Sequence, residues 1–166
     1  MRYVTLRYVA VSAAVSAAVR ASIHLSSTCQ IHDRSSHARP QQAAILYNLK
    51  ARHMRGKPYT RTGDIVIAVN PYQWMTDLYN EERRTLYAEK LVWEMITEGD
   101  PRTLVEPHVY ETSSLSYRGL ALDGIDQSIL VSGESGAGKT ETVKILMNHI
   151  ASVQARERTS HNDNNP

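Results

Sequence analysis

The chain has 166 residues, which is enough for one domain of ordinary size, and its composition is globular, with 42% hydrophobic and 22% charged residues. The formal net charge is +2, but residues 1–40 hold five Arg against one Asp, so the remainder is acidic by two charges. That remainder lacks the basic stripe typical of nucleic-acid binding. No apolar stretch approaches the about 18 residues of a transmembrane helix. A single cysteine, Cys29, excludes an intramolecular disulfide and suits a reducing compartment.

Residues 1–40 differ from the rest because they contain no acidic residue before Asp33. The stretch between Arg7 and Arg20 could be a weak signal-peptide core, and the Arg- and Ser-rich composition also resembles an organelle transit peptide. A disordered or poorly packed basic extension without a role is the preferred interpretation, since Ala and Ser give little hydrophobic drive. Residues 35–42 are polar and are expected to form a linker.

Residues 43–54 are predicted to form a helix with Leu46, Leu49 and Met54 on its apolar side. Residues 64–69 (DIVIAV) have the pattern of a buried strand, and Asn70-Pro71 ends it because proline cannot donate to a ladder. The next residues, 72–79, form an aromatic-rich loop. Its rings could flank a purine base or simply pack on the core, and composition alone favours packing.

Asn80 is expected to cap a helix that starts at Glu81, and Pro107 suits the first turn of a later helix. His108 and His149 are expected on helix surfaces, and no His/Cys set has the spacing of a zinc site. Residues 154–166 are polar and are predicted to be a disordered tail.

Residues 133–140 fit the pattern G-x-x-x-x-G-K-[ST], and we call them the glycine loop. An apolar, β-branched run at residues 128–132 precedes the loop, and an amphipathic helix with Val143, Leu146, Met147 and Ile150 on one face follows it. Glycines let successive N–H groups turn inward around an anion. The pattern predicts that Lys139 reaches the β- and γ-phosphates of a nucleotide and that the Thr140 hydroxyl is a Mg²⁺ ligand. The candidate phosphate-binding residues are therefore Gly133, Glu134, Ser135, Gly136, Ala137, Gly138, Lys139 and Thr140.

Five segments together resemble one protein family. They are residues 44–49 (AILYNL), 59–72 (YTRTGDIVIAVNPY), 107–118 (PHVYETSSLSYR), 126–132 (DQSILVS) and the glycine loop itself (GESGAGKT). In this order they are similar to the myosin motor domain, and the resemblance covers residues 43–153. It implies an α/β fold, the P-loop NTPase-type core of the myosin head, incomplete, with only part of the central sheet and its helices. The implied division is a basic extension (1–40), the N-terminal part of a motor domain (41–153) and a polar tail (154–166).

The resemblance also implies a function and reverses the interpretation of the aromatic loop. In this family the Asn-Pro pair and a Tyr shortly after it form the purine pocket, which here implies Asn70, Pro71 and Tyr79, although Tyr79 stands one residue further along than usual. ATP and Mg²⁺ are the implied cofactors, and an actin filament is the implied partner through a surface outside this chain. The implied location is the cytoplasmic cytoskeleton, in a myosin complex.

Departures from the family limit what this chain is expected to do. The segment between Leu86 and Pro107 is longer than usual, and both switch loops of the family are absent, so no catalytic residue is assigned. Residues 162–164 (NDN) resemble the opening of the first switch loop or are an Asn-rich tail. ATPase activity is therefore expected of a full-length motor. A generic P-loop nucleotide-binding module and a non-functional motor remnant remain the alternatives.

Overall fold

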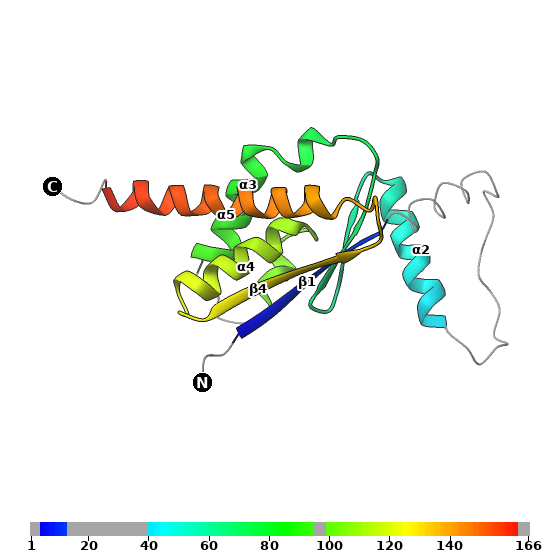
Figure 1. Cartoon of the computed structure of the whole chain (residues 1–166), viewed down its shortest axis with the longest axis horizontal. Helices are drawn as coiled ribbons and strands as arrows, with labels where there is room; N and C mark the ends of the chain where they lie inside the picture. Colours follow the sequence, from blue (N-terminus) through cyan, green and yellow to red (C-terminus); the bar gives the residue numbers. More distant parts are fainter. Residues whose placement is uncertain (1–3, 13–39, 95–98, 163–166) are drawn as a thin grey trace.

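The structure is a computed structural model that describes residues 4–12, 40–94 and 99–162. Its helices and strands, in chain order, are β1 (Val4–Ser12), α2 (Pro40–Met54), β2 (Tyr59–Thr62), β3 (Ile65–Val69), α3 (Glu81–Ala88), α4 (Val109–Ala121), β4 (Asp126–Gly133) and α5 (Lys139–Asn162) (Figure 1). Short 3₁₀ turns lie at Thr76–Leu78 and Pro101–Leu104, and a π-helical turn at Glu89–Trp93 continues α3. Mixed helices and strands agree with the predicted α/β class.

The four strands form one sheet in the order β2-β3-β1-β4. Strands β2 and β3 are an antiparallel hairpin, whereas β1 runs parallel to both of its neighbours. The register places Val9 opposite Val66 on one side and opposite Val131 on the other. Three parallel strands therefore end at the same edge of the sheet, and the glycine loop follows the end of β4.

Strand β1 is a correction to the sequence analysis, which assigned residues 4–12 to a poorly packed extension. These residues pair along their length with two strands, and Val9 is only 1% exposed. The composition of residues 4–12 did not indicate a strand, because this strand is stabilised by pairing with distant segments and by cross-strand packing. Residues 1–3 and 13–39 lie outside the described part of the chain, so the targeting interpretations and the environment of Cys29 stay predictions.

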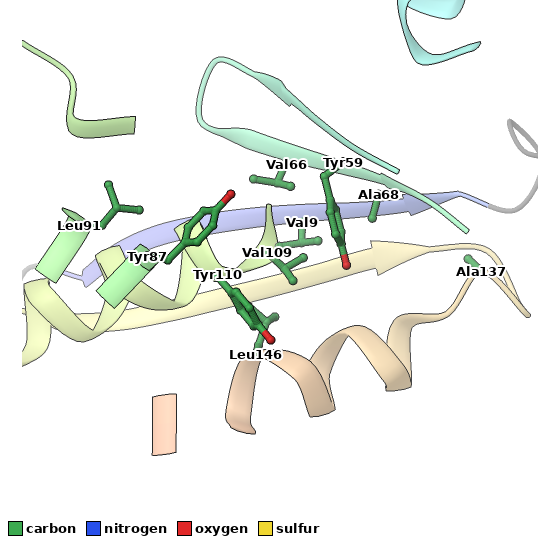
Figure 2. Packing of buried hydrophobic residues seen from close by; sticks show 10 residues of the cluster. All are labelled: Val9, Tyr59, Val66, Ala68, Tyr87, Leu91, Val109, Tyr110, Ala137 and Leu146. Atoms are coloured by element: carbon green, nitrogen blue, oxygen red, sulfur yellow. The ribbon is translucent and has the colours of Figure 1, made fainter. Parts of the chain in front are cut away.

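The main core packs helices α4 and α5 against one face of this sheet. Figure 2 shows the ten buried side chains of this cluster, which are Val9, Tyr59, Val66, Ala68, Tyr87, Leu91, Val109, Tyr110, Ala137 and Leu146. The sequence has no Phe, so tyrosines supply the large rings. Their hydroxyls need partners when buried, and the Tyr87 hydroxyl accordingly donates to the Glu106 carbonyl at 2.5 Å.

The helix boundaries follow local signals in some places and depart from them in others. Asn80 caps α3 as predicted, its side chain accepting a hydrogen bond from the Arg83 N–H at 2.9 Å. Helix α4 begins at Val109, so Pro107 precedes the helix and the His108 ring is its N-cap. Helix α5 runs to Asn162, which corrects the predicted disorder of residues 154–162: no Gly or Pro interrupts them, and Gln, Ala, Arg and Glu favour helix. Residues 163–166 lie outside the described part.

His108 and His149 are buried rather than on helix surfaces, with 1% and 0% exposure. His149 has partners at both ring nitrogens and His108 has one at Nδ1, which favours burial in the neutral form. His149 Nε2 lies 3.3 Å from the Arg84 carbonyl oxygen, so this nitrogen carries the proton and Nδ1 accepts from the Ser113 hydroxyl at 2.7 Å. The Tyr110 ring stacks on His149 with centroids 4.2 Å apart. Neutral imidazoles are thus core residues where α3, α4 and α5 meet.

None of the helices within the described residues is both long enough and apolar enough to cross a membrane.

Candidate functional site

The glycine loop connects the end of β4 to the start of α5. Strand β4 ends at Gly133 and α5 begins at Lys139, which is the strand-loop-helix setting predicted from the sequence. Gly136 and Gly138 have φ angles of 76° and 103°, a region that side chains disfavour. Ala137 between them is 1% exposed and anchors the loop in the core. The loop is therefore held by one buried residue and turned by two glycines.

The side chain of Lys139 folds back across this loop. Its Nζ donates to the carbonyl oxygens of Gly133 at 2.7 Å and Glu134 at 2.8 Å. The ammonium group consequently lies beside the loop backbone with two neutral acceptors and no carboxylate bound to it in the described part of the chain. Thr140, the next residue, is exposed at the first turn of α5.

A cavity of about 310 Å³ lies beside the loop. Its walls come from the end of β3, the aromatic loop and the beginning of α5, and the residues that matter for the prediction are Asn70, Pro71, Tyr79, Ala137 and Gly138. The three residues assigned to a purine pocket thus lie together, next to two residues of the glycine loop. The other six predicted loop residues, Gly133, Glu134, Ser135, Gly136, Lys139 and Thr140, do not line this cavity.

Asn70 connects the two parts of the site. Its amide nitrogen lies 3.4 Å from the Gly136 carbonyl oxygen, and its side-chain oxygen accepts from the Tyr72 N–H at 2.8 Å. The second bond closes a turn in which Tyr72 has a φ of 51°. Asn70 therefore holds the chain after β3 against the glycine loop, 66 residues later in the sequence.

An aromatic wall closes one side of the cavity. The hydroxyls of Tyr59 and Tyr79 hydrogen-bond at 2.7 Å, and the ring of Trp74 lies with its centroid 5.1 Å from that of Tyr79. Burial raises the pKa of both tyrosines, so their hydroxyls remain neutral. Sequence reasoning missed Tyr59 as part of this site, although it begins one of the resembling segments, and it also missed Glu141 and Thr142.

Comparisons with known proteins agree on one family. Residues 32–165 match the family described as Myosin head (motor domain). Similar proteins include Myosin-15 of Arabidopsis thaliana, 43% identical over 115 residues that cover 69% of this chain and 7% of that protein. Myosin-13 of the same plant is 39% identical over 126 residues, which cover 76% of this chain and 8% of that protein. Protein OPAQUE1 of Zea mays is 42% identical over 116 residues, which cover 69% of this chain and 7% of that protein.

The chain thus spans less than a tenth of the length of these relatives. The matched region nevertheless includes every segment that forms the glycine loop, the cavity and the aromatic wall. On the extent of these matches, the chain belongs to the myosin motor family.

Proposed function

We propose that this chain carries the ATP-binding segment of an actin-based motor, with residues 41–153 as the nucleotide-binding part of a P-loop NTPase-type core. The observation that supports this best is the position of the cavity directly beside the glycine loop, with Asn70 bonded to Gly136 between them. A ligand with a flat base and a phosphate chain matches a cavity that lies next to a glycine loop. A volume of about 310 Å³ is at the lower end of small-ligand pockets.

The residues fit a nucleotide and its magnesium ion chemically. Lys139 presents an ammonium group whose two carbonyl partners are neutral, and phosphate oxygens are stronger acceptors than those carbonyls. In the proposal, Lys139 transfers its hydrogen bonds from the loop carbonyls to phosphate oxygens, and the exposed Thr140 hydroxyl supplies a hard oxygen ligand to Mg²⁺. The bound ion would neutralise phosphate charge.

The base side of the proposal rests on the aromatic wall. Asn70, Pro71 and Tyr79 all line the cavity, and the Tyr79 hydroxyl is hydrogen-bonded to that of Tyr59. A purine placed between them would contact one proline face and one tyrosine ring. No residue is given a catalytic role, and ATP hydrolysis, actin binding and a cytoskeletal location are proposed only for the motor to which this segment belongs.

Calorimetric titration with a magnesium complex of a non-hydrolysable ATP analogue tests the proposal. We expect Lys139→Ala to weaken binding at least about tenfold, since hydrogen bonds to charged groups contribute about 1.5–3 kcal/mol each. Lys90→Ala is the matched control, because Lys90 pairs with Glu94 on the surface and lines none of the cavities described. Equal affinity of wild type and Lys139→Ala, or no binding by the folded wild type, would contradict a nucleotide site.

A further inference from the structure

A second and larger cavity lies on the other side of the aromatic wall. It has a volume of about 590 Å³, within the usual range of small-molecule sites. Tyr59 and Trp74 belong to both cavities, but no residue of the glycine loop lines this one. It is therefore distinct from the proposed phosphate site, and a ligand could occupy it whether or not the glycine loop binds a nucleotide.

The lining of this cavity is positively charged. It contains four basic residues, Arg52, Arg55, Lys57 and Arg83, against two acidic ones, Asp77 and Glu106. Glu106 is already engaged, since its carboxylate lies 3.1 Å from Lys57 Nζ and 3.7 Å from an Arg52 guanidinium nitrogen.

The two remaining arginines of the lining are unpaired. Within the described residues, the side chains of Arg55 and Arg83 have no ion pair or hydrogen bond, although Arg83 is half-buried. A partly buried guanidinium without a carboxylate partner is an available anion-binding group, because its planar fork can bind two oxygen atoms at once.

His108 adds a buried hydrogen-bond donor to the same wall. The ring is 1% exposed, and its Nδ1 accepts from the Tyr110 N–H at 3.1 Å, so the proton of the neutral ring is on Nε2. Among the described residues no acceptor meets hydrogen-bond geometry at Nε2, although the Leu78 carbonyl is near enough to favour the protonated ring. Buried polar atoms normally have a well-placed partner, and a ligand acceptor in the cavity would supply one.

The state of His108 is consistent with a neutral donor beside positive charge. The pKa of His108 is lowered to about 3, chiefly by burial and then by the charges of Arg83 and His149, while the nearby Leu78 carbonyl acts in the opposite direction. A negative group placed next to the neutral ring would be attracted by the charge of Arg83 and would accept the Nε2 proton in a hydrogen bond.

We propose that this cavity binds a small organic anion, with its carboxylate or phosphate group on Arg83 and His108 Nε2 and its apolar part on Trp74 and Met75. Trp74 is 67% exposed and presents a ring face that such a ligand can cover. Arg55, which lines the cavity and is exposed, adds long-range attraction. Carboxylate and phosphate ligands share this recognition chemistry, so the test includes both.

Calorimetric titration with 2-naphthoate and with 2-naphthyl phosphate tests the proposal, and 2-naphthol at neutral pH is the uncharged analogue. We expect at least one anion to bind and the analogue to bind far more weakly. Binding should shift the ¹⁵N resonance of His108 Nε2, which reports on this cavity directly. Arg83→Gln should weaken binding of the anion at least about tenfold, whereas Lys90→Gln, at a surface residue that does not line the cavity, should leave the affinity unchanged.

Further variants keep the outcome interpretable. Circular dichroism checks that Arg83→Gln is folded, and the exposed Arg55→Gln supplies a second, milder loss of charge. Lys139→Ala should leave naphthoate binding intact, which separates this cavity from the glycine loop. Equal binding of 2-naphthol, an unchanged affinity in folded Arg83→Gln, loss of binding in Lys139→Ala, or no binding of either anion would each overturn the proposal.

Discussion

Mild acid should destabilise this protein because two neutral histidines are buried in its core. Burial lowers the pKa of His108 to about 3 and that of His149 to about 4, against 6.5 in an unfolded chain. Above pH 6.5 neither state binds these protons. As the pH falls below 6.5 the unfolded chain becomes protonated while the folded one does not, so stability is lost progressively down to the folded pKa values.

The magnitude follows from the two pKa differences. Between pH 7.5 and pH 5 each histidine should cost about 2 kcal/mol of unfolding free energy, hence about 4 kcal/mol together. This is a large part of the roughly 5–15 kcal/mol that stabilises a typical domain. Burial raises the pKa of Glu111, and a raised carboxyl pKa contributes with the opposite sign, so a variant is needed to isolate the histidines.

Urea denaturation followed by circular dichroism at pH 7.5, 6.5, 5.5 and 5.0 measures the effect. In His149→Asn the loss between pH 7.5 and 5 should be about 2 kcal/mol smaller than in wild type, because one of the two groups no longer titrates. Ser113→Ala removes the hydroxyl that donates to His149 Nδ1 and serves as a second variant, with lower stability at every pH. Equal stability of the wild type at pH 7.5 and 5, or an unchanged pH dependence in His149→Asn, would refute this role of the buried histidines.

Two further substitutions test the packing around the site. Glu111→Ala removes the buried partner of Arg61, whose guanidinium lies 2.6 Å from the carboxylate, and should cost about 3–5 kcal/mol, whereas Glu94→Ala breaks the exposed pair with Lys90 and should cost less than about 1 kcal/mol. Asn80→Ala removes the cap of α3 and should lower the unfolding free energy by about 1 kcal/mol, with Asn80→Asp close to wild type. Urea denaturation at pH 7.5 measures all four, and equal costs for the two glutamates, or for the two Asn80 variants, would contradict these assignments.

Local features of the site could be predicted from the sequence because each depends on a few adjacent residues. The glycine loop needs glycines at defined spacing, and Gly136 and Gly138 do adopt the angles that favour them. The end of β3 at Asn70-Pro71 and the cap at Asn80 follow from the chemistry of single residues. These local preferences predict the structure well because they depend on the conformation of one or two residues rather than on packing against distant segments.

The buried face of α5 was predicted less well, because apolar periodicity alone does not choose between neighbouring stripes of a helix. Val143 and Met147 were expected inside and are 43% and 59% exposed. The stripe that packs is instead Thr142, Leu146, His149 and Val153. It includes a hydroxyl bonded to the Gly138 carbonyl and an imidazole bonded at both nitrogens, and polar side chains so paired can replace apolar ones in a core.

Strand β1 is the part of the fold that local reasoning could not supply, and it determines the geometry of the site. It separates β3 from β4 by two strand spacings, about 10 Å, so the ends of β3 and β4 are brought to one edge without touching. The register aligns Ser12 with Val69 and Val11 with Gly133, so all three parallel strands end together. Ligands of open parallel sheets bind at the carboxyl ends of strands. Asn70 extends from the end of β3 and reaches the Gly136 carbonyl across this gap. Strand β1 therefore sets the distance between the two halves of the candidate site, although none of its described side chains lines either cavity.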